Sequence, residues 1–485
     1  MRRRCAGLVL LGMIAGIVPA CPSAEAQVAV DGAAGSAGNL TAFYRLQERF
    51  TTKAPKDAPG MIGQNQVAFR ETASTDDPKD KERIIQAIYS ERPAAVSPVD
   101  DRVVTDSVKH YKSVTISPDP WKGRTDRRPL DDLAIWYRTV AGEAPAVLVL
   151  TPDRQLREEE YKFAINYNFV TDLSFILPDL PKRIGETWAV ERAGATALVN
   201  DDVFEGSLTA KFAEVRAHPK IEGMQLAIID VTGRIGTGFD TNKRDTAIRA
   251  RIQFAFTPEK SDESTIEGSG FIEKVSLSQV STLNIAGQIV KKQFKRQFVL
   301  ERKVPGTDAA IAIPDPPPAM TEANSWLTYT DPKKRFHIRH PQGFQPFFPA
   351  DEPGAVDLRR TYAVENQADI VRLQFVDKLT VKPEATFKQL IDAWRSKGIE
   401  VIPGLAAKLP ETEWGGLSVS HLEAALTTPE TQERASARRY FDGYVIQFPR
   451  NVSLFVSATT SQNEPESFRK QVLLMLKTVK LDAPK

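Results

Sequence analysis

Apolar and β-branched runs, separated by Gly, Pro and Asp, fill the chain from about residue 103 to residue 304. In the last run, QIVKKQFKRQFVLERKV, Phe294 and Phe298 fall on one face of an extended chain, and Lys291 and Lys295 fall on the other. Side chains of a β-strand alternate between two faces, so this pattern is typical of a half-buried antiparallel strand. The sequence therefore predicts an all-β middle domain, either a sandwich or a curved antiparallel sheet.

Six further runs in this region predict strands for the same reason. They are SVKHYKSVTI, PAVLVLT, TDLSFILP, MQLAIIDVTGRI, AIRARIQFAF and FIEKVSLSQVSTLNIAG. Residues 40–100 form a less regular lead-in, in which LTAFYRLQERF is expected to be a short helix. We expect the β-rich domain to span residues 40–303.

The N-terminus has the pattern of a secretory signal peptide. Arg2, Arg3 and Arg4 form a basic head, an apolar stretch follows over residues 8–18, and small residues end in an A-x-A site at residues 24–26. The apolar stretch is about a dozen residues long, short of the roughly 20 that a permanent membrane-spanning helix needs. We therefore expect residues 1–26 to be removed, residues 27–39 to form a disordered tether, and the mature protein to be exported without a transmembrane segment.

A second interpretation of the same region concerns Cys21. Residues 18–21, VPAC, resemble a bacterial lipobox, so lipid attachment at Cys21 and anchoring to the membrane are an alternative. The other cysteine of the chain, Cys5, precedes either cleavage site. We therefore expect no internal disulfide, zinc–cysteine cluster or cysteine nucleophile in the mature protein.

The charge of the mature chain is balanced. Of 64 basic and 62 acidic residues, three arginines and one glutamate lie in residues 1–26, which leaves 61 of each sign. Proteins that bind nucleic acid usually carry a basic excess on one face, and this balance argues against such a partner.

A proline-rich segment and a mixed α and β pattern complete the chain. Residues 304–325 contain five prolines among small residues, which predicts a semi-rigid linker. In PEATFKQLIDAWRSKGI, residues 387, 390, 391 and 394 are apolar and form one helical stripe, and EPESFRKQVLLMLKTVKL has a similar stripe. Between them, GLSVSHLEAALTT, ARRYFDGYVIQFP and NVSLFVSATT predict antiparallel strands. We expect an α+β sandwich over residues 326–485.

This last domain resembles the PsbP-like fold over residues 326–481. The resemblance lies in the hairpin TDPKKRFHIRHPQGF, with its F-x-I-x-x-P-x-G-F core, followed by paired strands, a central helix and a closing helix. The family includes extrinsic photosystem proteins and many exported bacterial proteins, so the resemblance implies fold and export. It defines no catalytic residue. The middle region is more loosely similar, through PDLPKRIGETWAVE, to β-rich domains of exported bacterial proteins.

The strongest chemical motif in the sequence is the histidine pair in RFHIRHP. On a strand, His337 and His340 point to opposite faces and cannot bind one metal ion. We therefore expect a solvent-facing His337 and a half-buried, hydrogen-bonded His340. GRIGTG at residues 233–238 is expected to be a hairpin connection, because its glycines do not fit a nucleotide-binding loop. DTNKRD at residues 240–245 does not fit an EF-hand.

The sequence contains no catalytic motif, and we predict no catalytic residue, metal or cofactor. The preferred function is a non-enzymatic binding or scaffolding protein of the bacterial cell envelope. One alternative is a carrier of lipid or lipoprotein, with an apolar groove in the β domain lined by Phe254, Phe256, Phe294 and Phe298. Another is a hydrolase whose site is assembled across domains. Partners are an unknown envelope protein or a lipid.

Overall fold

The computed structural model divides the chain into two compact units. The first unit comprises Met1–Arg154 and Lys162–Ala319, and the second comprises Gln155–Tyr161 and Met320–Lys485. The structure describes residues 42–48, 64–74, 82–117, 130–139, 145–166, 171–238, 243–261, 264–285, 288–302, 312–349, 354–361, 368–376, 382–428, 437–449, 452–461 and 465–481.

The first unit is built mainly of β-strands. Its elements are β1 (Phe43–Gln47), β2 (Gln64–Ser74), β3 (Glu82–Val96), β4 (Val104–Ser117), β5 (Leu133–Arg138), β6 (Ala146–Val149), the 3-10 helix η3 (Thr171–Ile176), β7 (Thr187–Ala189), α2 (Arg192–Val199), β8 (Val203–Ala217), β9 (Gln225–Thr237), β10 (Lys243–Lys260), β11 (Thr265–Ile285) and β12 (Gln288–Arg302). Helix α1 (Glu158–Asn166) begins in the segment that belongs to the second unit and ends in the first.

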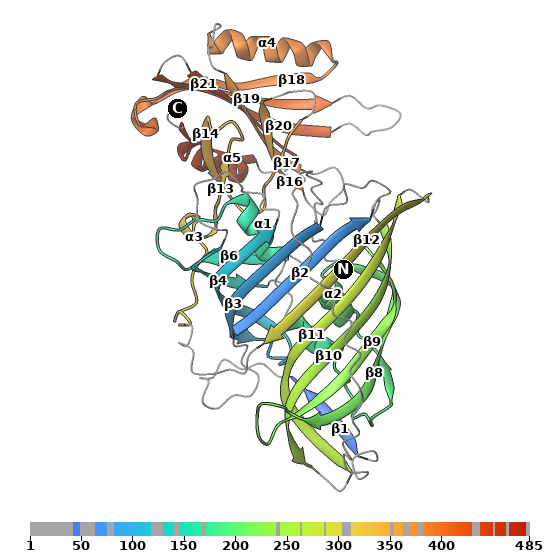
Figure 1. Ribbon diagram of the computed structural model, residues 1–485. Helices are drawn as coiled ribbons and strands as arrows, with labels where there is room; N and C mark the ends of the chain where they lie inside the picture. Colours follow the sequence, from blue (N-terminus) through green and yellow to red (C-terminus); the bar gives the residue numbers. More distant parts are fainter. Residues whose placement is uncertain are drawn as a thin grey trace. The chain divides into compact units, whose positions relative to one another are not determined.

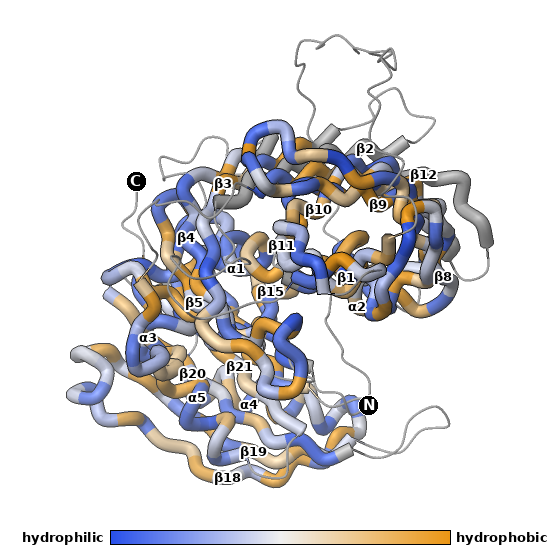
Figure 2. The backbone as a smooth tube through the Cα atoms, turned by 90° about the horizontal axis from the view of Figure 1, so that it is seen from below, coloured by the Kyte–Doolittle hydropathy of each residue, from blue (hydrophilic) through white to orange (hydrophobic). Residues whose placement is uncertain are grey.

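The strands of the first unit form one curved sheet (Figure 1). Its order is β6-β5-β4-β3-β2-β12-β11-β10-β9-β8-β7, and neighbours along this path are antiparallel. Hydrophobic and hydrophilic residues are interleaved along the strands (Figure 2), as a sheet with one buried face requires. The expected β-rich architecture is thus confirmed in its curved antiparallel form.

Two local predictions in the first unit are wrong. LTAFYRLQERF contains strand β1 rather than a helix, with Tyr44 and Leu46 buried at a spacing of two. TDLSFILP forms the 3-10 helix η3 rather than a strand, and its buried Leu173 and Ile176 are three residues apart. Both segments are short, and their apolar residues fit the helical period as well as the strand period. Contacts with the rest of the unit therefore decide which element forms.

Strand β1 lies within the curve of the sheet (Figures 1 and 2). It pairs in parallel with the start of β11, and Tyr44 also exchanges backbone hydrogen bonds with Lys182. Next to this pairing, a Cβ at Gly270 would overlap the carbonyl oxygen of Ala255, so the close approach of β10 and β11 requires glycine there. Glu48, which directly follows β1, forms a buried ion pair of 2.7 Å with Arg302.

The basic strand β12 lies in the interior of the sheet order. It pairs with β11 on one side and with β2 on the other from Gln293 onward, so this part of the strand is not a sheet edge. Phe298 and Leu300 expose 1% and 0% of their surface, whereas Lys295 and Gln297 are exposed. The predicted alternation of its faces is therefore confirmed where side chains are described.

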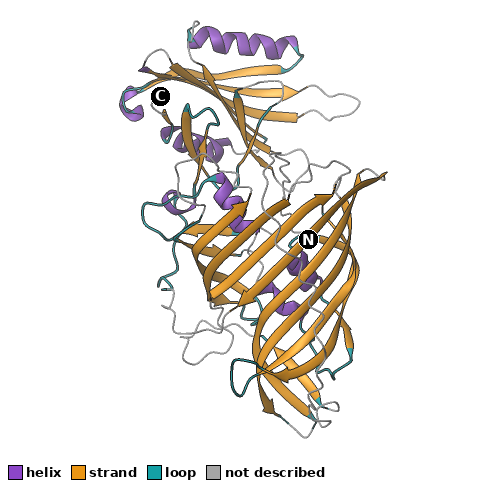
Figure 3. Ribbon diagram, in the orientation of Figure 1, coloured by secondary structure: helices purple, strands orange, loops and turns teal. Residues whose placement is uncertain are grey.

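The second unit combines one large sheet, a small sheet and helices (Figure 3). Its elements are α3 (Glu322–Ser325), β13 (Leu327–Thr330), β14 (Phe336–His340), β15 (Gln345–Phe347), β16 (Ala355–Thr361), β17 (Ala368–Val376), α4 (Pro383–Ser396), β18 (Glu400–Leu409), the 3-10 helix η5 (Glu411–Trp414), β19 (Ser418–Thr428), β20 (Ala437–Phe448), β21 (Val452–Thr460), α5 (Pro465–Lys477) and β22 (Lys480–Leu481). Both predicted helices and all three predicted strands of this region are present.

The large sheet of the second unit has the order β15-β16-β17-β21-β20-β19-β18, and the small sheet has the order β13-β14-β22. Two hydrophobic cores lie on opposite faces of the large sheet. On one face, Phe468 and Met475 of α5 pack with Leu454 and Val456 of β21. On the other, Phe387 of α4 packs in a separate core with residues of β19 and β20. The unit is therefore a three-layer α+β structure.

A short segment from the middle of the sequence joins the second unit. Thr328 of β13 donates a backbone hydrogen bond to Leu156, and its hydroxyl donates to Gln155. His340 of β14 lies 2.8 Å from the Glu158 carboxylate. The sequence placed this segment inside the β-rich domain, because nothing in its local pattern signals these distant partners. The later division, between residues 319 and 320, falls within the expected linker.

The turn between β13 and β14 is organised by Asp331. Its carboxylate accepts backbone hydrogen bonds from Lys333 and Arg335, and the Arg335 side chain donates to both carboxylate oxygens at 2.8 Å. Burial alone would raise the pKa of Asp331, but the hydrogen bonds and charge of Arg335 outweigh it and lower the pKa. The carboxylate thus stabilises the folded hairpin in its charged form.

We expect Asp331→Asn to lower the free energy of unfolding by about 1–3 kcal/mol at pH 7, since the amide cannot accept at both positions. Folding lowers the pKa of Asp331. Its contribution to stability is therefore fully present above about pH 3.9, the pKa of an aspartate in the unfolded chain, and is lost as the pH falls through the lower pKa of the folded state. The difference between the two proteins should therefore shrink in acid, as measured by urea denaturation from pH 7 to pH 3. Asp392→Asn, on the exposed side of α4, is the control; an equal loss from it would contradict this role.

Candidate functional site

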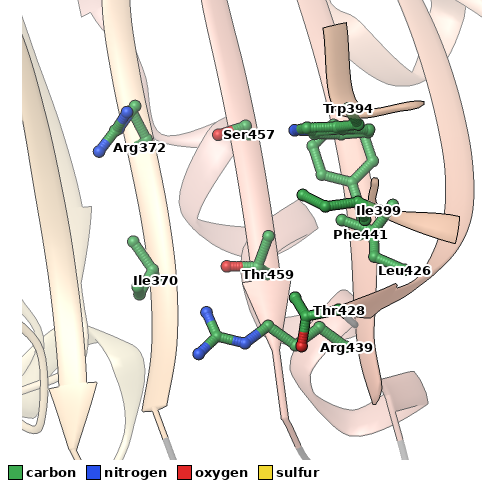
Figure 4. Close-up of a pocket in the computed structure, with 10 residues that line it drawn as sticks. All are labelled: Ile370, Arg372, Trp394, Ile399, Leu426, Thr428, Arg439, Phe441, Ser457 and Thr459. Atoms are coloured by element: carbon green, nitrogen blue, oxygen red, sulfur yellow. The ribbon is translucent and has the colours of Figure 1, made fainter. Parts of the chain in front are cut away.

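A groove lies beside α4 on the face of the large sheet that this helix partly covers (Figure 4). It has a volume of about 260 Å³. Its lining combines five apolar side chains, three hydroxyls and two arginines. These are Ile370, Arg372, Trp394, Ile399, Leu426, Thr428, Arg439, Phe441, Ser457 and Thr459. We call this the α4 groove.

The apolar wall of the α4 groove follows from the helical stripe predicted from the sequence. Trp394 is the last residue of the stripe, and its ring meets Phe441 of β20 edge to face, with centroids 4.6 Å apart. Gly398 ends the helix region with a φ of 75°, a conformation that favours glycine, and Ile399 follows it. The helix therefore ends where the groove opens.

The opposite side of the α4 groove is polar because β17 and β21 turn hydrophilic residues toward α4. Arg372 alternates with buried Val371 and Leu373 on β17, and Ser457 and Thr459 alternate in the same way with buried residues of β21. In Figure 4, Arg372 and the end of Arg439 lie on the side away from Trp394. The groove thus has an apolar wall and a cationic, hydroxyl-bearing side.

Arg372 is held in place by Asp357 of β16. Its Nε lies 2.7 Å and its Nη2 3.1 Å from the two carboxylate oxygens, and Arg359 donates to the same carboxylate. Burial alone would raise the pKa of Asp357, but the hydrogen bonds from Arg372 and Arg359 outweigh it and lower the pKa. Two guanidinium groups share one carboxylate, so this part of the sheet face carries an excess positive charge.

Arg439 is the second cation of the α4 groove. It lies near the start of β20 and is half-buried. Within the described part of the chain it makes no hydrogen bond or ion pair with a carboxylate. Its neighbour Arg438 is exposed and lies over the ring of Tyr440. The two adjacent arginines therefore have different surroundings.

The aromatic residues expected to line an open apolar groove in the first unit are buried. Phe254 and Phe256 expose 0% of their surface and Phe298 exposes 1%, while the side chain of Phe294 lies outside the described residues. Tyr44 of β1 packs against Phe256 and Phe212 at centroid distances of 6.3 and 5.4 Å. In this structure, β1 fills the space over that face. Cys21 lies outside the described residues.

The histidines bond to carboxylates and backbone groups rather than to one another. His110 lies 3.1 Å from Asp132 and His421 lies 3.1 Å from Asp442. His218 accepts two backbone hydrogen bonds at Nδ1, so its Nε2 carries the proton that faces Glu273. These contacts indicate that His110, His218 and His421 have structural roles.

The predicted hairpin pair is arranged nearly as expected. His337 and His340 point to opposite faces of β14, which confirms their separation. His340 is, however, fully buried rather than half-buried, because Glu158 and the carbonyl of Pro341 flank its ring. The expectation that GRIGTG is a hairpin connection is wrong: residues 233–237 belong to β9 and pair with β8 and β10, and only Gly238 follows the strand. Residues 240–242 of DTNKRD lie outside the described residues.

One cluster has the composition of a metal site. Ligand atoms of His421, Glu423 and Asp442 lie within 4.8 Å of one another. Arg469 of α5 donates to Asp442 at 3.0 Å and lies 3.4 Å from Glu423. Burial lowers the pKa of Arg469, but the two carboxylates outweigh it and raise the pKa. The guanidinium group thus supplies the positive charge that this cluster needs and ties α5 to the sheet.

A second polar cluster lies in the interior of the first unit. Lys109 is fully buried, with its Nζ 5.0 Å from the ring centroids of both Tyr89 and Tyr137. Its Nζ is 3.5 Å from the buried carboxylate of Glu91, which also accepts a hydrogen bond from Ser107. Burial lowers the pKa of Lys109, and Glu91 opposes that change. The cluster is a buried ion pair within an aromatic cage.

The sequence did not reveal the α4 groove, although one signal was present. In β17 and β21, Arg372, Ser457 and Thr459 place polar side chains on a face that a central strand would normally bury. Together with a single short helical stripe, this pattern shows that the predicted helix cannot cover the whole sheet.

Helices that could cross a membrane are absent from the described residues. No protein-family model matches the chain, and no curated protein matches it. Among solved structures, a mutant porin of Rh. blastica is similar at 8% identity over 82% of this chain and 99% of the porin, with a TM-score of 0.13. Pseudomonas aeruginosa OprD is similar at 9% identity over 84% of this chain and 98% of its own, with a TM-score of 0.11. Scores this low carry no argument about fold or function.

The buried pair of the first unit permits a double-mutant test. Lys109→Met leaves the buried carboxylate of Glu91 without a counter-ion, and Glu91→Leu leaves the buried ammonium group of Lys109 without one. Each variant should therefore lower the free energy of unfolding by about 3–5 kcal/mol. The double variant should cost far less than the sum, because it removes both charges. Urea denaturation of the four proteins measures the coupling, and additive losses would contradict it.

The same set of variants tests the pH dependence of folding. Because burial lowers the pKa of Lys109, the folded state binds fewer protons than the unfolded state between the two pKa values. The free energy of unfolding of the wild type should therefore rise as the pH increases toward about 10.4, the pKa of a lysine in the unfolded chain. That rise should be smaller in the double variant.

Proposed function

We propose that this chain is an exported, non-enzymatic binding or scaffolding protein of the bacterial cell envelope, and that its second unit holds a small ligand in the α4 groove. The observation that carries the proposal is the groove itself, in which an aromatic wall faces two arginines and three hydroxyls. Ligand sites commonly combine apolar walls with a few converging polar groups.

The chemistry of the lining favours recognition over catalysis. Guanidinium groups and hydroxyls bind and orient a ligand, and the rings of Trp394 and Phe441 supply contact area. None of the ten lining residues is a carboxylate or an imidazole, the groups that most often act as general acid or base.

Export and family resemblance belong to the same proposal. The signal-peptide pattern of residues 1–26 supports export to the periplasm or beyond, with lipid anchoring at Cys21 as the alternative. The order of elements in the second unit, with an opening hairpin, α4 between strand groups and α5 near the end, supports a PsbP-like fold for residues 326–481.

Native mass spectrometry of the mature protein, purified from its own envelope fraction, tests the proposed site. We expect the wild type to retain a small molecule and Ser457→Phe to lose it, because the new ring would point into the groove. Ser396→Phe adds the same ring to an exposed position of α4 outside the lining and should retain the ligand.

Two results would contradict this proposal. Equal retention by Ser457→Phe and the wild type would place the ligand elsewhere in the chain. A wild type without any retained molecule would favour a protein partner, and a pull-down from the same envelope fraction would then identify it. Thermal unfolding of both variants shows whether each remains folded.

A second candidate function is a carrier of lipid or lipoprotein. The specific observation that favours it is the apolar inner face of the curved sheet, which is covered in part by β1, a strand of only five residues. A ligand that bound at Phe254 and Phe256 would have to displace β1, because Tyr44 and Leu46 occupy that space.

A disulfide that locks β1 in place tests the carrier function. Phe43 and Thr265 are partners in the β1–β11 pairing, and strands about 4.8 Å apart suit a disulfide. If β1 must move, Phe43→Cys/Thr265→Cys should retain lipid when reduced and lose it when oxidised, as measured by mass spectrometry. Equal retention in both states would contradict the carrier function.

A further inference from the structure

We infer that the ligand of the α4 groove is a small amphipathic anion, whose carboxylate or phosphate binds at Arg439 and whose apolar part lies against Trp394, Ile399 and Phe441. This inference rests on the proposed function, since it specifies the ligand class of the same groove. Three features of the lining carry it: its charge, the surroundings of Arg439 and its size.

The lining carries charge of one sign. It contains two arginines and no acidic residue. Within the described residues, Arg372 forms an ion pair with Asp357, and Arg359 pairs with the same carboxylate. An anion in the groove would therefore meet a positive potential that the surrounding sheet does not cancel, whereas a cation would be repelled.

Arg439 is the group best suited to bind the anion. It is half-buried and makes no ion pair within the described residues, while several other arginines of the same sheet are paired. Arg360, for example, donates to the buried carboxylate of Asp369. A guanidinium group offers a planar fork of donors that fits a carboxylate or a phosphate. The hydroxyls of Thr459 and Thr428, which line the same part of the groove, can donate further hydrogen bonds (Figure 4).

The volume limits the apolar part of the ligand. About 260 Å³ corresponds to roughly nine groups of the size of a water molecule at ~30 Å³ each. A chain of about eight carbons, or one aromatic ring with a short arm, matches this size. Trp394 and Phe441 meet edge to face and leave ring surfaces for such a group.

Isothermal titration calorimetry of the full mature chain with ligands of equal chain length tests the inference. The probes are octanoate, octyl phosphate, 1-octanol and octylammonium, all at neutral pH and below their aggregation concentrations. At least one of the two anions should bind about tenfold or more tightly than 1-octanol, and octylammonium should bind most weakly. The comparison of octanoate with octyl phosphate shows which headgroup is preferred.

Matched arginine variants locate the anion. Arg439→Gln should weaken binding of the preferred anion about tenfold and leave binding of 1-octanol unchanged, since it removes the charge and the guanidinium group but keeps a polar side chain. Arg438→Gln makes the same change at the adjacent, exposed position and should change neither. Equal weakening by both variants would indicate unspecific attraction by surface charge and would overturn the assignment to Arg439.

The remaining outcomes separate this inference from the proposed function. If 1-octanol binds as tightly as the anions and Ser457→Phe abolishes binding of both, the groove binds ligands but the anion inference is wrong. If none of the four probes binds, the inference is also wrong, and the ligand retained from the envelope decides whether the groove binds anything. If octylammonium binds most tightly, the assumed sign of the charge is wrong.

Discussion

A single helix is too narrow to cover a seven-stranded sheet, and the architecture of the second unit depends on this mismatch. An α-helix with its side chains is about 10–12 Å wide, whereas neighbouring strands are about 4.8 Å apart, so one helix covers two or three strands. The core beneath α4 accordingly draws mainly on β19 and β20, with Val401 of β18 at its edge. Phe455 of β21 still packs against Phe387 of α4. Farther from the helix, β17 and β21 turn Arg372, Ser457 and Thr459 to the same face. The α4 groove is the boundary between the covered and uncovered parts of the sheet.

In the first unit, the sheet is covered in a different way. Its sheet curves, and β1 of the same chain packs on the inner face, where Tyr44 contacts Phe212 and Phe256. Gly194 of α2 approaches the backbone of Phe175 so closely that a Cβ would lie 2.8 Å from it, which shows how tightly the two helical elements pack. The buried Glu48–Arg302 pair fixes the end of β1 in this interior. A closed interior of this kind stabilises the fold, and ligand binding there would require part of it to open.

The sequence predicted those elements whose pattern is local. The stripe of α4 and the alternation of β12 could be recognised because their apolar residues recur at regular spacing. β1 and η3 could not, because a few apolar residues satisfy both periods and distant contacts choose between them. The segment at Gln155 and the α4 groove were missed for a similar reason. Each depends on residues far apart in the chain, such as Thr328 with Leu156, or Trp394 with Thr459.

Paired and unpaired charges distinguish structural from functional polar residues in this protein. Lys109 with Glu91, Arg302 with Glu48 and Arg360 with Asp369 each place opposite charges together, and at least one partner of each pair is buried. Such pairs offset the cost of removing charges from water and leave little attraction for a ligand. Arg439 differs, because it is half-buried in a groove and makes no ion pair within the described residues. An arginine without a carboxylate partner can still bind an anion. The α4 groove, rather than the buried ion pairs, is therefore the part of this chain that best explains ligand recognition.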